Sequence, residues 1–193
     1  NINALNRLLQ SVKTAEELAE AYNGVMPGLA DASGRETARD ALDYCSGATT
    51  FVVGYLTGSA GLYTQMATAM NSRNLDAKNS AERFKSFKDN KGSYVGLLVA
   101  NAFSHECVFA KTGEQWAFYQ ANRTKAKENF TLAPKLNPEG RNWCINDMSQ
   151  PQFVDFFASL TDAGRAARLF PYAAPPVSWK LSVYSFAGAN LLA

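Results

Sequence analysis

The chain contains few of the residues that most often carry out chemistry. Its 193 residues include a single histidine, His105, and three cysteines. A structural zinc site normally needs four close ligands, and no two of the cysteines form a CxxC pair. The glycines match neither the GxGxxG pattern nor a P-loop, which argues against a nucleotide cofactor. These absences predict a protein without a metal or a cofactor.

His105 is the candidate for a catalytic base. A hydrolase would need a nucleophile within hydrogen-bond reach of this side chain. Cys107 is close to it in sequence, and Cys45 or Cys144 could approach it in space. The simpler interpretation is that His105 is a partly buried helix residue. We therefore predict that the chain is not an enzyme.

Charge of either sign is scarce as well. The formal net charge is +2, and no basic block is interleaved with aromatic residues, so we expect no nucleic-acid partner. The hydrophobic content of 47% excludes a disordered chain, and the length suits one buried core. We expect a single helical domain over residues 1–193. Two polar regions, 73–92 and 110–142, are interpreted as inserted segments.

The longest stretch without any charged residue is Tyr44–Ser72. We interpret it as a central helix or a helical pair, with Gly54, Gly58 and Gly61 as close-packing contacts. The Gly58–Gly61 segment is also turn-like. A membrane span is the alternative, since about 20 apolar residues cross a bilayer and the Gly54–Gly58 spacing occurs in packed membrane helices. Frequent hydroxyl side chains favour a buried helix in a soluble domain.

The remaining sequence predicts further helices around this stretch. The fold class that we expect is all-α, a compact single-domain bundle of about six to eight helices. Capping boxes begin helices at Thr14 and Ser33, and Ser149 caps a helix that has Pro151 in its first turn. The other predicted helices cover residues 1–10, 93–109 (with a strand at its start as an alternative), 114–128 (with Trp116, Phe118 and Tyr119 buried), 151–160 and 177–192.

The cysteines suggest a structural role. Cys45 precedes the central stretch and Cys144 precedes the helix near Pro151, so a bridge between them would join the two ends of the middle region. Closing so long a loop contributes up to about 5 kcal/mol in the chain-entropy model. Three buried thiols, with Cys107 as the third, are the alternative.

Export from the cell fits these observations. A first residue Asn1 in place of Met agrees with a processed mature protein, and equally with a trimmed chain. A bridge would also require an oxidising compartment. Glycosylation sequons at Asn122 and Asn129 matter only in a source that glycosylates. We expect a periplasmic or secreted protein.

One set of motifs resembles a known family. The motifs are Cys45 followed by Gly54-Tyr55-Leu56-x-Gly58-x2-Gly61, then Trp143-Cys144-Ile145, then Gln152-Phe153-Val154-x2-Phe157. They resemble the Tai-type immunity proteins, which are small, disulfide-bonded, mostly helical periplasmic proteins. These protect bacteria from peptidoglycan amidase effectors delivered by type VI secretion. The chain departs from the family in the long segment between its two cysteine motifs.

The function that we expect from the sequence is therefore that of an exported helical binding protein. The most specific version of this hypothesis is an immunity protein that blocks the cleft of a cell-wall amidase with a loop or helix end. Two alternatives remain open. One is a subunit of a filament or shell that self-associates through helix packing. The other is a membrane-inserted protein with spans at Tyr44–Ser72 and Ser93–Phe109.

Overall fold

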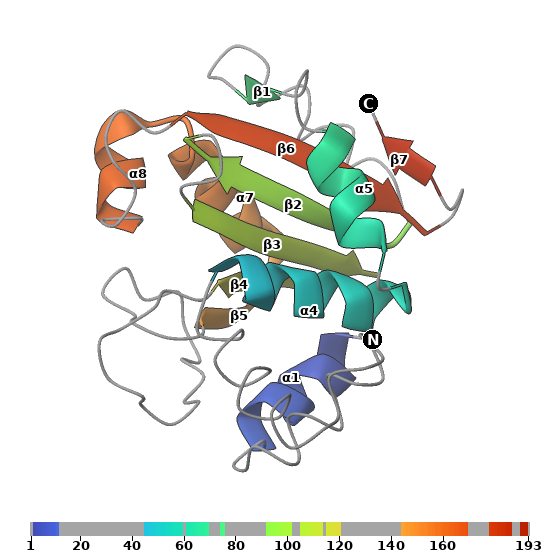
Figure 1. Ribbon diagram of the computed structural model, residues 1–193. Helices are drawn as coiled ribbons and strands as arrows, with labels where there is room; N and C mark the ends of the chain where they lie inside the picture. Colours follow the sequence, from blue (N-terminus) through green and yellow to red (C-terminus); the bar gives the residue numbers. More distant parts are fainter. Residues whose placement is uncertain are drawn as a thin grey trace, which may run out of the picture.

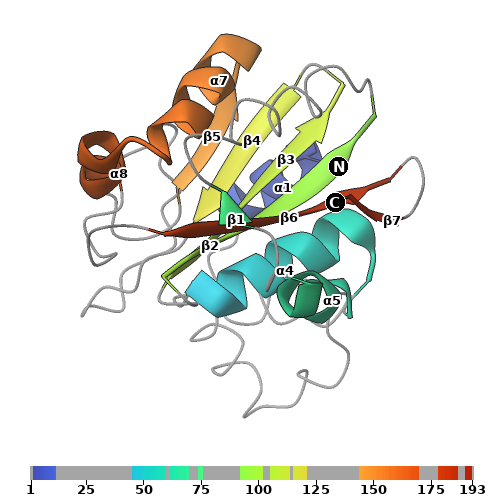
Figure 2. The ribbon, with the colours of Figure 1, turned by 90° about the horizontal axis from the view of Figure 1, so that it is seen from above.

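Helices lie on both faces of one antiparallel sheet (Figures 1 and 2). The structure is a computed structural model of the chain. It describes residues 2–11, 45–59, 61–69, 74–75, 92–101, 105–113, 115–120, 144–169, 178–186 and 190–192. The helices predicted from Thr14 and Ser33, and the sequons at Asn122 and Asn129, lie outside the described residues.

The elements alternate between helical and extended segments along the chain. The helices are α1 (Ile2–Ser11), α4 (Cys45–Thr57), α5 (Leu62–Thr68), α7 (Gln150–Ser159) and α8 (Ala163–Leu169). The strands are β1 (Asn74–Leu75), β2 (Tyr94–Ala100), β3 (His105–Thr112), β4 (Gln115–Gln120), β5 (Cys144–Met148), β6 (Trp179–Ser185) and β7 (Asn190–Leu192).

The sheet is built around a meander. Strands β2, β3, β4 and β5 pair in sequence order, each antiparallel to the next. After the helices α7 and α8, β6 returns to pair with the free side of β2. The short strands β1 and β7 both pair with β6 at the outer side of the sheet. This order places β2 and β3 at the centre, where both of their faces are covered.

Two apolar clusters cover the two faces. On β2, Val95, Leu97 and Val99 point into the cluster formed with α1, α4 and α5, on what we call the first face. Tyr94 and Leu98 point the other way, into the cluster formed with α7, on the second face. Figure 2 shows α4 and α5 on one side of the sheet and α7 on the other. Because successive side chains of a strand point to opposite faces, β2 contributes residues to two separate cores.

The prediction of an all-α bundle is wrong, because the centre of the protein is this sheet. The helix predicted over 93–109 instead contains β2 and the first five residues of β3, so the strand alternative at its start was the correct one. Every residue of β2 is buried. A strand covered on both faces reads as a continuous apolar run, and periodicity does not distinguish such a run from a buried helix.

Two more predicted helices are strands. The 114–128 segment contains β4, although the buried state of Trp116, Phe118 and Tyr119 is confirmed. The 177–192 segment contains β6 and β7 rather than a closing helix. On β4, Trp116 and Phe118 join the second-face cluster, and Ala117 and Tyr119 join the first-face cluster. On β6, Trp179, Leu181 and Val183 join the second-face cluster.

Three predicted helices are confirmed. The 1–10 segment forms α1, and the central stretch forms the helical pair α4 and α5, whose apolar side chains are buried on the sheet. Helix α4 runs without a break through Gly47. The 151–160 helix is α7, and Ser149 caps it in a capping box with Gln152, as its sequence indicates.

The glycines of the central stretch have different roles from those expected. Gly58 has a φ of +70° and its N–H donates to the Gly54 carbonyl at 2.8 Å, so it ends α4 in a left-handed turn. A methyl group at Gly58 or Gly61 would meet no atom within 4 Å, so neither is a close-packing contact. Gly54 is buried within α4, and its packing role stays a prediction.

The close-packed glycine is Gly96, at the centre of β2. A Cβ atom there would lie 2.2 Å from the ring of Phe109, its partner across the strand pair. The ring therefore occupies the space that a side chain would need.

The membrane alternative finds no support in the described helices. None of them is both long enough and apolar enough to cross a bilayer.

Candidate functional site

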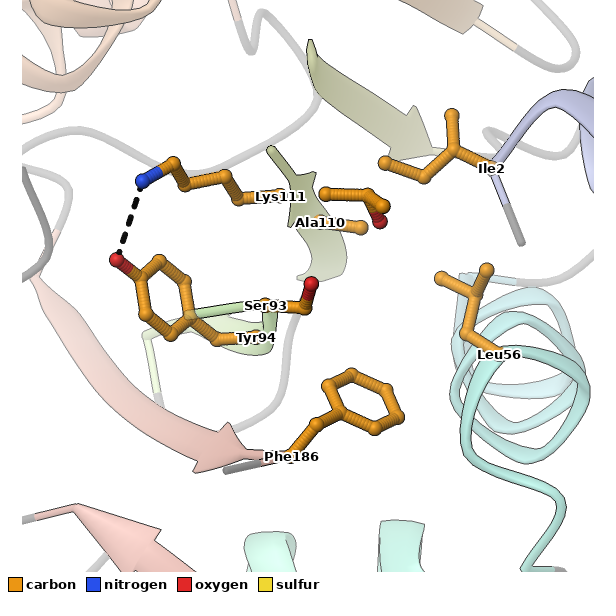
Figure 3. A pocket seen from close by; sticks show the side chains of 8 residues that line it. Ile2, Leu56, Ser93, Tyr94, Ala110, Lys111 and Phe186 are labelled. Atoms are coloured by element: carbon orange, nitrogen blue, oxygen red, sulfur yellow. Dashed lines mark hydrogen bonds between the residues drawn. The ribbon is translucent and has the colours of Figure 1, made fainter. Parts of the chain in front are cut away.

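A pocket of about 270 Å³ lies at the end of the sheet where β2 begins and where β3 and β6 end. The residues that line it are Ile2, Leu56, Ser93, Tyr94, Ala110, Lys111, Thr112 and Phe186. They belong to α1, α4, the central strands and the turn after β6, and Figure 3 shows how they surround the space.

The pocket has a buried floor and an exposed rim. Ile2 and Ala110 are buried and belong to the apolar cluster on the first face. On the rim, Thr112 is exposed and the Phe186 side chain is 38% exposed, whereas the other Phe rings that the structure describes are buried. Since the floor is buried and the rim is exposed, the pocket can receive a group from outside.

Backbone pairing fixes the rim. The Phe186 N–H donates to the Ser93 carbonyl at 3.0 Å, which holds the end of β6 beside the start of β2. The Phe186 ring meets Tyr184 edge to face, with 5.5 Å between ring centroids. Leu56 is the last residue but one of α4 and forms the opposite wall (Figure 3). The exposed ring is thus held in place.

The charge of Lys111 is kept away from this wall. Its side chain and that of Tyr94 extend to the other side of the strands, away from Leu56 and Phe186 (Figure 3). There Lys111 Nζ lies 3.4 Å from the Tyr94 hydroxyl and 5.3 Å from the ring centroids of Tyr94 and Trp116. Burial raises the pKa of Tyr94 to about 12, so this phenol stays protonated. The side of the pocket formed by Leu56 and Phe186 is uncharged, and Lys111 lines the opposite side.

A buried polar cluster lies under α4 and α5. The Glu106 side chain, on β3, is 3% exposed and points to the first face. The Thr49 hydroxyl of α4 donates to its Oε2 at 2.9 Å, and the Tyr63 hydroxyl of α5 donates to its Oε1 at 2.6 Å. One carboxyl group thus joins two helices to the centre of the sheet.

Burial dominates the acidity of this carboxyl. Desolvation raises the pKa of Glu106, and the hydrogen bonds from Tyr63 and Thr49 offset part of that rise. The described parts of α4 and α5 contain no Asp, Glu, Lys or Arg. Lys180 lies in the same row of the sheet, on β6, with Val99 of β2 between it and Glu106. No cation of α4 or α5 therefore offsets the cost of burying the charge.

The structure places His105 and Cys107, two of the candidate catalytic residues, on β3. His105 and Cys107 lie on the second face of β3, both buried, and neither lines the pocket. His105 belongs to a strand, so its interpretation as a helix residue is wrong. In the part of the chain that the structure describes, no three His, Cys, Asp or Glu side chains are grouped as metal ligands.

The predicted disulfide stays a prediction. Cys45 begins α4 and Cys144 begins β5, but their side chains lie outside what the structure describes.

Sequence reasoning missed the residues that form both sites. The pocket residues come from segments far apart in the chain, and no local motif marks them. Glu106 did leave a signal, because it is the only Asp, Glu, Lys or Arg between Lys91 and Lys111.

Comparison with known proteins gives no further guide to function. No family model, no curated protein and no solved structure matches the chain. A functional argument therefore has to start from the geometry of the pocket and of the Glu106 cluster.

Proposed function

We propose that this chain is a binding protein that takes an apolar side chain of a partner protein into the pocket. The observation that carries the proposal is the exposed Phe186 ring beside an open apolar cavity. Aromatic residues at well-packed pockets supply much of the affinity in protein interfaces. A cavity of about 270 Å³ is at the lower end of small-molecule sites, which supports one inserted side chain rather than a large ligand.

The partner that we propose is a cell-wall amidase, with the protein acting outside the cytoplasm. This part rests on the resemblance to Tai-type immunity proteins. That resemblance implied a mostly helical fold, whereas the centre of this chain is a sheet. The pocket therefore supports binding, and the resemblance alone supports the identity of the partner.

The test is inhibition of an amidase encoded beside this protein, measured as release of peptidoglycan fragments. We expect the wild-type protein to inhibit it and Phe186→Ala to weaken binding about 30-fold or more, the usual loss at a central aromatic contact. Val154→Ala is the matched control, because Val154 is 39% exposed but lies on α7, at the second face.

Two results would contradict the proposal. Full amidase activity in the presence of the wild-type protein would exclude the immunity form. Equal losses in the Phe186 and Val154 variants would exclude the pocket as the binding site. If light scattering instead shows growth of particles with concentration, and Phe186→Ala prevents it, the occupant is a second copy of the chain, as in the assembly alternative.

A further inference from the structure

The pocket contains two hydroxyl groups beside its apolar walls. Ser93 precedes β2 and Thr112 ends β3, and both contribute to the lining. Neither side chain makes a hydrogen bond to any residue that the structure describes. Figure 3 shows the Ser93 hydroxyl pointing into the space between Ala110, Leu56 and Phe186. Each hydroxyl can both donate and accept.

The absence of a charged group on this wall limits what can enter. An ion that leaves water needs a partner of opposite charge, and the nearest cation of the lining, Lys111, points away toward Tyr94. A carboxylate or an ammonium placed between Leu56 and Phe186 would therefore lose water without gaining a partner of opposite charge. The pocket therefore selects an uncharged group.

The volume limits the size of that group. An apolar cavity of about 150 Å³ already holds a benzene molecule. The volume of about 270 Å³ leaves space for one aromatic ring, a hydroxyl and the carbon atoms that connect the ring to a chain. Ile2, Leu56 and Phe186 supply apolar contacts for the faces and edges of such a ring.

We infer that the pocket recognises a phenol, presented as a tyrosine side chain of the partner. The ring contacts Leu56 and Phe186, and the phenolic hydroxyl exchanges hydrogen bonds with Ser93 and Thr112. This inference rests on the proposed binding function and adds the chemical identity of the group that is bound.

The experiment compares 4-methylphenol with toluene, which differ only in the hydroxyl group. Both are titrated into the full chain and followed by amide chemical shifts in ¹H–¹⁵N NMR. We expect 4-methylphenol to shift the amide signals of Ser93, Thr112 and Phe186. Its affinity should exceed that of toluene by about fivefold for one net hydrogen bond and about 30-fold for two.

The double variant Ser93→Ala with Thr112→Val isolates the two hydroxyls. We expect it to remove the preference for 4-methylphenol while the affinity for toluene stays the same, which also shows that the pocket has kept its shape. Ser178→Ala is the control, since Ser178 is an exposed serine just before the other end of β6. It should leave both affinities unchanged.

Several outcomes would overturn the inference. They are equal binding of the two probes, a preference that survives in the double variant, shifts confined to another part of the protein, and no binding of either probe. The small probes need no partner protein, so this result is independent of the amidase assay. A wild-type protein that inhibits the amidase but shows no preference for the phenol would refute only the inference. One that prefers the phenol but does not inhibit would refute only the proposed function.

Discussion

Replacing Glu106 with glutamine removes a buried titratable charge and keeps the shape of the side chain. In the protein, Thr49 and Tyr63 both donate to this carboxyl. The amide oxygen can still accept from Tyr63, and the amide nitrogen can donate to the Thr49 hydroxyl, which is itself able to accept. We therefore expect Glu106→Gln to fold normally and to change how stability depends on pH.

The direction follows from the raised pKa. The folded protein holds the Glu106 proton more tightly than the unfolded chain, because burial raises the pKa of the carboxyl above its value of 4.5. The folded state then binds more protons in the window between 4.5 and the raised pKa. The contribution of this group to stability is fully present below the window and is lost as pH rises through it.

The size of the effect has an upper limit. One proton taken up on folding changes the free energy of unfolding by at most about 1.4 kcal/mol per pH unit. Above the window the wild-type protein carries a buried charge and Glu106→Gln does not, so the variant should be the more stable of the two. Glu106→Ala should instead be destabilised by about 1–3 kcal/mol, mainly because the buried Thr49 hydroxyl loses its acceptor.

The assay is urea denaturation at pH values from 4 to 8, with the midpoint and the m-value fitted at each. The control is Asp155→Asn, which removes an exposed carboxylate that pairs with Arg165 at 2.6 Å. The control should follow the wild-type curve closely, since exposed pairs contribute little. The reasoning is refuted if Glu106→Gln keeps the wild-type pH dependence. It is also refuted if the variant is less stable than the wild-type protein above the window.

Three further predictions concern packing and the cysteines. Gly96→Ala should cost about 1–3 kcal/mol or more in urea denaturation, because the new methyl overlaps the Phe109 ring, and Phe109→Leu should recover part of the loss; additive losses would contradict this. Ser182→Ala should raise stability by about 1 kcal/mol, since the buried Ser182 hydroxyl has no hydrogen-bond partner in the described structure, and a destabilised variant would show that it does have one. A bridge between Cys45 and Cys144 leaves one thiol that reacts in denaturant, whereas three reactive thiols would exclude it.

Local signals were sufficient to predict two of the helices that cover the faces of the sheet, α1 and α7. The 1–10 segment has apolar residues at helical spacing, and the Ser149 capping box lies directly before a proline and an apolar run. These signals depend only on neighbours in the chain. They could therefore be recognised in the sequence without knowledge of the distant contacts that bury the helices.

The sheet was not predictable in the same way. The run from Tyr94 to Ala100 is buried on both faces, so it lacks the alternation that identifies a strand with one face in water. Its β-branched and aromatic residues were the better guide. In β6, Trp179, Leu181 and Val183 alternate with less apolar residues, but that spacing was interpreted as the face of a helix. β6 is a strand because it pairs with β2, which is about 80 residues away along the chain, so the neighbouring sequence does not show this pairing.

The two sites differ in what sequence could reveal. A lone carboxylate in a long segment without other acidic or basic residues, such as Glu106, indicates a buried polar contact, although its partners on α4 and α5 can be identified only from the fold. No pattern in the sequence indicated the pocket. Ser93, Thr112 and Phe186 are unremarkable residues in turns and strand ends, and only the antiparallel register brings them together.

Helix α4 connects the Glu106 cluster to the pocket. Thr49 and Leu56 are about two helical turns apart on it, so they lie on nearly the same side of the helix. Apolar burial is not directional, and contacts such as that of Phe51 would tolerate some sliding of α4 along the sheet. The hydrogen bonds from Thr49 and Tyr63 to one carboxyl group fix where the α4–α5 pair sits, and with it the position of Leu56 in the pocket wall. Burying Glu106 thus costs stability, but the hydrogen bonds to it hold Leu56 in place and so define the shape of the pocket.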